Sequence, residues 1–559
     1  MGELPPNMTD YQATRESFRL EVPATFNYAR DVVDAWAARE PGRRALLSVG
    51  PDGGGVRRFS FQDLARSSNR AARFLAAQGV GKGDRVFVML PRIPDWYDVV
   101  LGCIKLGAVP MPGTTLLTAR DVAYRVQRAD ATVAVTDAAG AATVDQAAEH
   151  CPSLATRICV AGAPSGDSPG VGPGPAWASW ADGLAAAGEE PPDVEPTRSD
   201  DPLLLYFTSG TVAYPKMVLH TQASLGIGHQ LTARFWQDLH PDDLHWTLSD
   251  FGWAKAAWGK LFGQWSVGAT NFLWDLRGKP DFDLMLRLLG EHGVTTFCAP
   301  PTVYRALVQL DLAAYDWSRL RHCVSAGEPL NPEVIKVWRE ATGLTVYDGY
   351  GQTETVNLLA NYRCLPVRPG SMGKPTPGFD VCVVDDDGKV LGPGEEGHVA
   401  VRVSPERPVG LFVEYWRDPE ATAAAFRGDF YYTGDRAYVD EDGYFWFVGR
   451  SDDVINSAAY RIGPFEVESA LVEHPAVAEA AVVGKPDPER GQIVKAFVVL
   501  AQGRAGSDDL VRELQDHCKR VTAPYKYPRE VEFVEELPKT ISGKIRRVEL
   551  REREQAAGR

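Results

Sequence analysis

The stretch that decides the fold of this chain is Leu203–His220, LLLYFTSGTVAYPKMVLH. An apolar run typical of a buried strand leads into a loop with three hydroxyl side chains, a glycine and a lysine. Gly210 allows backbone N–H groups to approach an anion closely, and Lys216 supplies a mobile point charge. The spacing differs from that of P-loop NTPases, because Met217 follows the lysine. Taken alone, the stretch fits a phosphate-binding loop and a plain polar turn equally well.

Strand-like and helical segments alternate around this loop. Arg85–Leu90 has the pattern of a buried strand, Asp95–Leu106 that of a helix, and Ala131–Val135 that of the next strand. This order predicts an α/β fold with mostly parallel sheets covered by helices. The Pro-, Gly- and acid-rich residues 161–200 are expected to form a surface excursion within a domain, with an inter-domain linker as the alternative.

A domain boundary is predicted near Gly449–Asp453. The elements expected beyond it are helices at Pro464–Glu473 and Val511–Arg520 and strands at Ala480–Val483, Lys495–Leu500 and Val531–Val534. We therefore expect a large N-terminal domain over residues 1–451 and a small α+β C-terminal domain over residues 452–559.

Composition excludes several classes of function. The 559 residues are 44% hydrophobic and 24% charged, as in ordinary globular proteins, and the net charge of −15 disfavours nucleic acid as a partner. No run of about 18 apolar residues suggests a membrane span. The eight cysteines are scattered without a C-x-x-C pair, and Met1–Pro23 does not have the pattern of a leader peptide. These features predict a cytoplasmic protein without a disulfide framework or zinc site.

Further motifs follow the loop in a fixed order. They are YDGYGQTET (Tyr347–Thr355), YYTGD (Tyr431–Asp435), GRSDD (Gly449–Asp453), YRIG (Tyr460–Gly463) and PKTISGKIRR (Pro538–Arg547). Glu354 lies among hydroxyls, as a magnesium–phosphate site requires. Asp435 follows a glycine turn, where its carboxylate can accept hydrogen bonds from two ribose hydroxyls. Lys544 follows Gly543 in a turn whose residues indicate exposure to solvent. Each motif alone fits solvated surface, but their joint occurrence in this order is not expected by chance.

With these motifs the chain resembles the acyl- and aryl-adenylate-forming superfamily of AMP-binding enzymes, from about Phe26 to Leu550. It looks most like medium-chain acyl-CoA synthetases. The stretches behind this finer resemblance are LSDFGWAKAAWGKLFGQW (Leu248–Trp265), DGYGQTETV (Asp348–Val356), INSAAYRIGPFEVE (Ile455–Glu468) and VTAPYKYPREVEF (Val521–Phe533).

The resemblance implies an ATP-dependent acyl-CoA synthetase that forms an acyl-adenylate and then transfers the acyl group to coenzyme A. ATP, Mg²⁺ and coenzyme A would take part. The catalytic residues it implies are Lys544, Arg461, Lys216 and the metal ligand Glu354. The ATP-binding residues it implies are Thr208, Ser209, Gly210, Thr211, Lys216, Gly327, Glu328, Pro329, Asp348, Gly349, Tyr350, Gln352, Thr353, Asp435, Arg450, Arg461 and Lys544.

The resemblance also implies a mobile C-terminal domain with its hinge at Asp452. Rotation about the hinge would withdraw Lys544 and bring a pantetheine-binding segment to the site. The implied coenzyme A residues are Ala458, Ala459, Tyr460, Arg490, Lys519 and Arg529. The implied acyl-pocket residues are Trp253, Gly327 and Gly351. Because acetate-specific relatives carry Trp at the position of Gly351, we expect a deeper pocket that prefers medium-chain, branched or aromatic acids.

Three positions depart from the family pattern: Ala213 and Ala459 replace glycines, and Phe251 replaces a common threonine. A methyl group at Ala459 is expected to narrow the path of the pantetheine arm. One alternative is therefore an enzyme that passes its acyl-adenylate to a separate carrier-protein thiol, and a second is a non-catalytic nucleotide-binding protein. The expected partner is a small carboxylic acid, with no nucleic acid and no membrane span, and the expected assembly is a monomer or homodimer.

Overall fold

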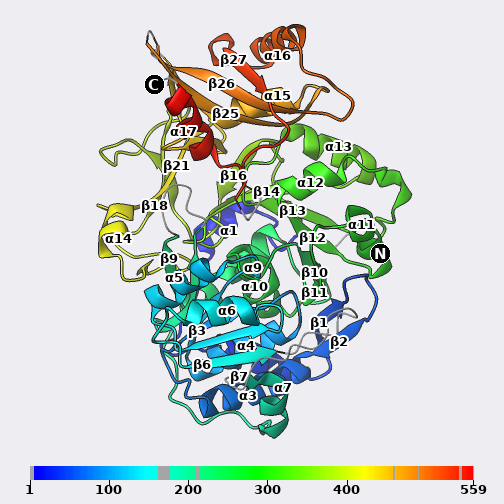
Figure 1. Ribbon diagram of the computed structural model, residues 1–559, viewed down its shortest axis with the longest axis vertical. Coiled ribbons are helices and arrows are strands. Elements are labelled where there is room, and N and C mark those ends of the chain that lie inside the picture. The colour runs from blue at the N-terminus through cyan, green and yellow to red at the C-terminus, as the bar shows by residue number, and fades with distance from the viewer. Residues whose placement is uncertain are drawn as a thin grey trace.

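The computed structural model of the protein describes residues 5–160, 177–208, 215–457, 460–488, 490–540 and 544–557. Within these residues the strands form four sheets (Figure 1). A parallel five-stranded sheet contains, in spatial order, β4 (Val109–Pro112), β3 (Arg85–Met89), β5 (Val133–Asp137), β6 (Thr156–Val160) and β7 (Trp177–Ser179). A three-stranded sheet contains β19 (Glu414–Tyr415), β9 (Met217–Thr221) and β8 (Pro202–Phe207).

A large mixed sheet runs through the middle of the molecule. Its antiparallel strands are β17 (Val381–Val384), β18 (Gly397–Arg402), β21 (Phe430–Val439), β20 (Phe426–Arg427), β22 (Phe445–Arg450), β16 (Ser371–Pro375) and β15 (Leu359–Ala360). Beyond these lie β14 (Val346–Tyr350), β13 (His322–Ala326), β12 (Thr296–Ala299), β10 (Leu244–Thr247), β11 (Thr270–Trp274), β1 (Arg44–Val49) and the antiparallel edge strand β2 (Arg57–Ser60). The strands from β14 to β1 pair in parallel. This sheet therefore joins the expected parallel fold to an antiparallel half.

Helices cover the sheets, as the α/β pattern predicts. Those before the three-stranded sheet are α1 (Tyr11–Ser17), α2 (Ala35–Arg39), α3 (Phe61–Ala77), α4 (Asp95–Leu106), α5 (Ala119–Ala129), α6 (Ala141–Ala148) and α7 (Trp180–Ala186). Those after it are α8 (His229–Leu231), α9 (Lys255–Lys260), α10 (Phe262–Ser266), α11 (Phe282–Glu291), α12 (Pro301–Leu307), α13 (Pro332–Thr342) and α14 (Pro419–Ala425). The fold class expected from the sequence is confirmed.

The C-terminal part forms its own small α+β unit, at the top of Figure 1. Its sheet contains β24 (Tyr460–Ile462), β23 (Ile455–Ser457), β26 (Gly491–Leu500), β25 (Val477–Asp487) and β27 (Glu530–Phe533). Its helices are α15 (Pro464–Val472), α16 (Asp508–Val521) and α17 (Arg547–Ala557). Each helix and strand predicted beyond residue 453 has a counterpart here, with ends shifted by a few residues.

Local signals in the sequence explain several helix ends. The Ser60 side chain accepts a hydrogen bond from the backbone of Asp63, whose carboxylate accepts one in return, so a capping box begins α3. Gly107 ends α4 with a left-handed φ of 71°, which glycine adopts without steric cost. The pairing of β6 with β7 places both sides of residues 161–176 in one sheet. This pairing agrees with a surface excursion, although residues 161–176 themselves lie outside the described residues.

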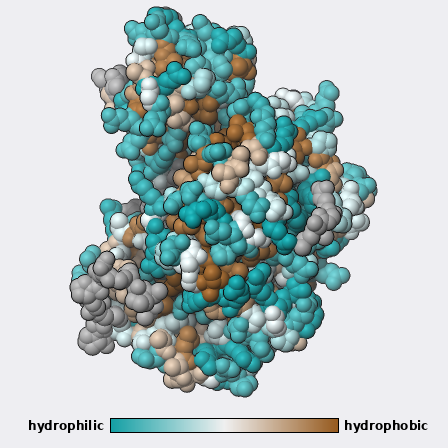
Figure 2. All heavy atoms as spheres, turned by 90° about the vertical axis from the view of Figure 1, so that its right-hand side faces the viewer, coloured by the Kyte–Doolittle hydropathy of each residue, from teal (hydrophilic) through white to brown (hydrophobic). Residues whose placement is uncertain are grey.

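All eight cysteines are free, and all except the half-buried Cys364 are buried. Phe251, one of the departures from the family pattern, is fully buried and stacks on Trp96 with ring centroids 4.0 Å apart. Most side chains on the face shown in Figure 2 are hydrophilic, with scattered apolar ones. In the described part of the chain, no helix combines the length and the apolar character that crossing a bilayer requires.

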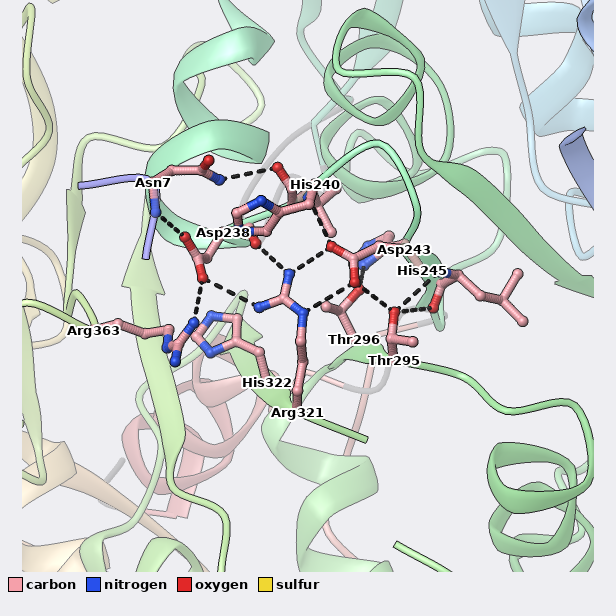
Figure 3. A network of polar contacts seen from close by, with 12 residues as sticks. Asn7, Asp238, His240, Asp243, His245, Thr295, Thr296, Arg321, His322 and Arg363 are labelled. Carbon is pink, nitrogen blue, oxygen red and sulfur yellow. Dashed lines mark hydrogen bonds and ion pairs between the residues drawn. The ribbon is translucent and has the colours of Figure 1, made fainter. Parts of the chain in front are cut away.

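A buried polar network ties the beginning of the chain to the large sheet (Figure 3). Arg321 donates to Asp243 at 3.0 Å and forms an ion pair with Asp238 at 3.2 Å. Asp238 also pairs with Arg363 at 2.7 Å and accepts a hydrogen bond from the backbone N–H of Asn7 at 2.7 Å. Since burial of an unpaired charge is costly, these groups stabilise the fold only as a set.

We expect Asp243→Ala to lower the free energy of unfolding by about 3 to 5 kcal/mol, because Arg321 would lose a buried partner. Burial alone would raise the pKa of Asp243, but the hydrogen bonds and charge of Arg321 outweigh it and hold that pKa below its usual range. The stabilisation by Asp243 is therefore present at neutral pH and is lost as the pH falls through the lowered pKa.

Denaturant unfolding at pH 7 and at acidic pH measures this effect. Asp242→Ala is the matched control, because the Asp242 side chain is 94% exposed and should contribute little. An Asp243→Ala protein as stable as the wild type at pH 7 would contradict the expectation.

Candidate active site

A cleft with a volume of about 810 Å³ lies between the large sheet and the C-terminal unit. Residues on β14, β21 and β22 line one side of it, and residues on α15, β25 and α17 line the other. The ATP-binding residues expected from the sequence that line it are Thr208, Lys216, Gly327, Glu328, Pro329, Asp348, Gly349, Tyr350, Gln352, Thr353, Asp435, Arg450 and Lys544. Glu354, Gly351 and Asp452 also line it.

A buried carboxylate lies at the centre of this cleft. Asp435 on β21 is 4% exposed and accepts hydrogen bonds from the hydroxyl of Tyr350 at 2.6 Å and from Nε2 of Gln352 at 2.8 Å. Arg450 on β22 lies 3.4 Å from it. Burial raises the pKa of Asp435, and the charge of Arg450 opposes that rise. The site therefore offers a fixed acceptor beside a fixed cation.

A second carboxylate lies in the middle of β14. Asp348 is 6% exposed and accepts a hydrogen bond from the backbone N–H of Gly349 at 3.0 Å. Burial raises its pKa to about 8. Glu328 faces the same cleft and pairs with Arg305 at 2.9 Å. Neighbouring Gly327 has a φ of 114°, a conformation that glycine adopts most readily.

The ends of the hydroxyl-rich loop lie at the cleft. The backbone N–H of Thr208 donates to the carbonyl of Lys216 at 3.0 Å, and Oγ1 of Thr208 accepts from the backbone N–H of Lys216 at 3.2 Å. The Lys216 ammonium lies 4.4 Å from the ring centre of Tyr415, whose hydroxyl donates to Glu354 at 2.8 Å. A lysine and a buried carboxylate thus share one aromatic neighbour. Ser209, Gly210, Thr211 and Ala213 lie outside the described residues.

Glu354 is the carboxylate expected to hold a metal. It is 8% exposed, burial raises its pKa, and the hydrogen bond from Tyr415 opposes that rise, with smaller contributions from the charges of Arg450 and Lys216. Among the described residues, no group of three or more His, Cys, Asp or Glu side chains is arranged to hold a metal ion. Magnesium needs fewer protein ligands, since it is commonly held by one or two carboxylates together with substrate phosphates. Glu354 fits that requirement.

Lys544 reaches the cleft from the C-terminal unit. Its side chain is exposed to solvent at the cleft, and the protein atoms around it limit its hydration. This partial desolvation lowers its pKa, while the negative charges of Glu328, Asp435 and Glu354 oppose the fall. The lysine expected to act on the reacting groups therefore faces the carboxylates of the opposite wall.

Other expected residues lie away from the cleft. Arg461 is exposed on β24 and does not line it. Tyr460 is 48% exposed and stacks on Tyr525 with ring centroids 4.1 Å apart. Lys519 and Arg529 both lie against the ring of Tyr527, and the backbone of Arg490 donates to Asp487 at 2.8 Å. Ala458 and Ala459 lie outside the described residues.

The residues expected at the acyl pocket differ in their position. Gly327 and Gly351 line the cleft, whereas the half-buried Trp253 does not. The indole of Trp258 fills the space beside Gly351, because a Cβ on Gly351 would lie 2.3 Å from it. Trp258 is 6% exposed and packs edge to face against Trp236, with ring centroids 6.1 Å apart. Trp258 therefore limits the space beside Gly351 from within the core and does not itself line the cleft.

Several other residues at the cleft were not predicted. Arg305, Tyr415 and Arg547 line it, although the sequence motifs assigned a role to none of them. Tyr415 and Arg305 stand in stretches without a distinctive pattern. Arg547 lies within PKTISGKIRR, where two adjacent arginines gave no indication of which one faces inward.

Two family profiles of known proteins match this chain. The family profile described as AMP-binding enzyme matches residues 33–416, and the profile of the AMP-binding enzyme C-terminal domain matches residues 466–544. The chain belongs to the AMP-binding enzyme family.

Relatives of this AMP-binding enzyme include acyl-coenzyme A synthetases. The mitochondrial acyl-coenzyme A synthetase ACSM3 of Mus musculus is 47% identical, with 98% of this chain and 94% of that protein covered. The mitochondrial acyl-coenzyme A synthetase ACSM4 of Homo sapiens is 48% identical, with the same coverage of 98% and 94%. The resemblance to acyl-CoA synthetases stated from the sequence is confirmed.

Solved structures with a similar fold include CoA ligases. The anthranilate CoA ligase AuaEII in complex with anthranoyl-AMP has a TM-score of 0.86 and 30% identity, covering 96% of this chain and 99% of that one. A benzoate CoA ligase from Burkholderia xenovorans LB400 has a TM-score of 0.80 and 29% identity, covering 94% of this chain and 100% of that one. This AMP-binding enzyme therefore has the architecture of a large N-terminal and a small C-terminal domain.

The expectation of a cytoplasmic protein is wrong by the sequence comparisons, because the relatives ACSM3 and ACSM4 are named as mitochondrial enzymes. It rested on scattered free cysteines and on the composition of the first residues. Free cysteines indicate a reducing environment but do not distinguish one reducing compartment from another.

We expect Lys544 of this AMP-binding enzyme to react with an amine-directed acylating reagent at lower pH than the lysine of a short reference peptide. Its lowered pKa leaves a larger fraction of free amine at any pH below the usual lysine range. Mass spectrometry after brief labelling of a mixture of protein and peptide at several pH values measures both amines in one sample. Labelling of Lys544 only at the pH required by the peptide lysine would contradict the expectation.

Proposed function

We propose that this protein is an ATP-dependent acyl-CoA synthetase that converts a carboxylic acid, ATP and coenzyme A into acyl-CoA, AMP and diphosphate. The observation that carries the proposal is that one cleft gathers Lys544 from the C-terminal unit with Glu354 and Asp435 from the large sheet. A site that only binds a nucleotide needs no lysine from a second domain. The confirmed relationship to acyl-coenzyme A synthetases supports the same conclusion.

Each wall of the cleft suits one part of ATP. Asp435, held beside Arg450, would accept hydrogen bonds from the ribose hydroxyls. The residues proposed to line the adenine are Gly327, Glu328, Pro329, Asp348, Gly349 and Tyr350, with Gln352 and Thr353 beside them. Thr208 and Lys216 would contact the phosphates, together with Ser209, Gly210 and Thr211. Glu354 would hold Mg²⁺, which neutralises phosphate charge when it is bound.

In the first step a weak nucleophile, the carboxylate of the acid, attacks the anionic α-phosphate of ATP. A carboxylate oxygen of the acid forms a bond to the α-phosphorus, and the bond from that phosphorus to the diphosphate oxygen breaks. No proton transfer is needed, so positioning and charge neutralisation supply most of the catalysis. Lys544 is proposed to bridge the carboxylate and the α-phosphate, and its ammonium would offset the charge that gathers there. Lys216 would act on the leaving diphosphate, with Arg461 as a further phosphate contact.

The second step is attack by the coenzyme A thiol on the acyl-adenylate, which forms the thioester and releases AMP. We propose that residues 452–559 rotate as a domain about Asp452, whose carboxylate lies 3.8 Å from Arg450. Rotation would remove Lys544 and bring β24, with Tyr460 and Arg461, toward the cleft. Ala458 and Ala459 would then line the pantetheine path, and Arg490, Lys519 and Arg529 would face the phosphates of coenzyme A.

The acid is proposed to lie beside Gly351, between Gly327 and the indole of Trp258. An enclosed apolar wall favours acids longer than acetate, since each buried methylene contributes about 0.8 kcal/mol, roughly a fourfold preference. Medium-chain, branched or aromatic acids are therefore the proposed substrates, with Trp253 near the entrance. Transfer of the acyl group to a carrier-protein thiol is the competing proposal, motivated by the methyl group of Ala459.

Parallel measurement of diphosphate release and acyl-CoA formation tests the proposal, with acids from acetate through octanoate to benzoate. We expect equal amounts of both products and higher kcat/KM for acids longer than acetate. Lys544→Ala should lose diphosphate release by about 100-fold or more, since a transition-state contact would be absent. Diphosphate without thioester would support the carrier-protein alternative, and neither product with any acid would contradict the synthetase proposal.

We expect Trp258→Leu to raise kcat/KM for octanoate relative to butyrate by about fourfold or more, because the smaller side chain leaves room for further methylenes beside Gly351. The ratio between the two acids cancels any loss of folded enzyme. Trp246→Leu is the matched control, because Trp246 packs against Phe272 in a different core cluster. An unchanged ratio in Trp258→Leu would exclude Trp258 from the acyl pocket.

A further inference from the structure

Lys544 lies on one of two paired arms, residues 538–540 and 544–547, on either side of residues that lie outside the described ones. The backbone N–H of Thr540 donates to the carbonyl of Lys544 at 2.7 Å, and that of Lys544 donates to Oγ1 of Thr540 at 3.1 Å. The backbone N–H of Arg546 donates to the carbonyl of Pro538 at 2.8 Å. These bonds fix the arms to each other. They do not fix the loop to the rest of the C-terminal unit.

A buried ion pair fixes the second arm. Arg547, the first residue of α17, approaches Glu468 of α15 with its guanidinium fork: Nη2 lies 2.6 Å from Oε2 and Nε lies 3.0 Å from Oε1. The Glu468 side chain is 9% exposed and its Oε1 also accepts from the backbone N–H of Val482 on β25 at 2.8 Å. One carboxylate therefore joins α15, β25 and α17. Bidentate pairs of this kind are both strong and specific in direction.

The anchor of the first arm is much weaker. Lys539 pairs with Glu479 at 2.7 Å, but their side chains are 38% and 35% exposed. Water and salt screen such a pair, so it contributes little to positioning. Ile545, next to Lys544, packs against the small core cluster that contains Leu537 and Leu550. Among the charged contacts of the two arms, that of Arg547, three residues beyond Lys544, is therefore the main one that positions the lysine.

The same helix also binds the residue that follows the proposed hinge. Arg551 forms an ion pair with Asp453, and Arg547 lies 3.9 Å from the same carboxylate. Asp453 directly follows Asp452 and its side chain is 13% exposed. The start of the C-terminal unit and the lysine loop are thus held to one helix, so that Lys544 and the hinge end move as one body.

We propose that Arg547 and Glu468 are positioning residues for Lys544, holding its loop at the depth where the ammonium faces Glu328, Asp435 and Glu354. This inference rests on the proposed function, because only adenylation uses Lys544 in the cleft. Loss of the pair lets the loop shift, and a displacement of about 1 Å at a reacting group costs up to about 100-fold in rate. The thioester step, which proceeds with Lys544 withdrawn, does not depend on the pair.

The two half-reactions are measured separately on the full chain. Exchange of labelled diphosphate into ATP in the presence of acid reports adenylation, and thioester formation from a chemically prepared acyl-adenylate and coenzyme A reports the second step. We expect Arg547→Gln and Glu468→Gln to lower kcat of exchange by about tenfold or more while the thioester step stays within about twofold. Arg547→Lys, which keeps the charge without the fork, should recover part of the exchange activity.

Glu468→Gln retains an acceptor for the backbone of Val482, so that it separates positioning from folding of the C-terminal unit. Arg553→Gln is the matched control on the same helix, because Arg553 is exposed and pairs with Glu532 at the surface; both half-reactions should be unchanged. Equal losses in the two half-reactions, or no loss in either, would overturn the positioning role. A wild-type protein without exchange for any acid would instead overturn the proposed function on which the role rests.

Discussion

The arrangement of the site depends on one buried carboxylate, that of Asp435. A charge removed from water is tolerated only when donors and an opposite charge surround it. Tyr350 and Gln352 supply hydrogen bonds at 2.6 and 2.8 Å from the β14 end, and Arg450 approaches at 3.4 Å from the next strand. These partners come from the parallel half and the antiparallel half of the same large sheet. Satisfying Asp435 therefore sets how the two halves meet, and the cleft forms where they do.

Much of the fold could be predicted, because short-range patterns in the sequence indicate individual helices and strands. Asp95–Leu106 carries acids in its first turn and a glycine at its end, and the helix has those bounds in the structure. Val133–Asp137, by contrast, begins two residues later than its apolar run suggested, since alanine and threonine fit a strand and the turn before it equally well. The antiparallel pairing in the other half of the large sheet was not predicted. Strand pairing between residues far apart in sequence leaves no local pattern.

The candidate site, too, could be predicted only in part from the sequence. Motif residues such as Lys216, Glu354 and Lys544 were found because hydroxyls, glycines and charges stand together in the sequence, and the structure brings all three to one cleft. The contact between Trp258 and Gly351 was not predicted, because an indole filling the space beside a glycine depends on how α9 lies against the residue that follows β14. Arg461 belongs to a recognisable motif, YRIG, yet it is exposed on β24 in this arrangement. A sequence specifies which residues a site has more readily than which of them meet in one conformation.

The hydrogen bonds of the first described residues have a consequence for the order of folding. Asn7 binds a carboxylate 231 residues away, and the hydroxyl of Tyr11 donates to the carbonyl of Pro375, 364 residues away. Closing loops of this length costs entropy that only an already formed partner surface can offset. During synthesis this segment leaves the ribosome well before Pro375, so its docking surface is incomplete until several hundred further residues have followed. A segment that is made early is thus among the last to reach its folded position.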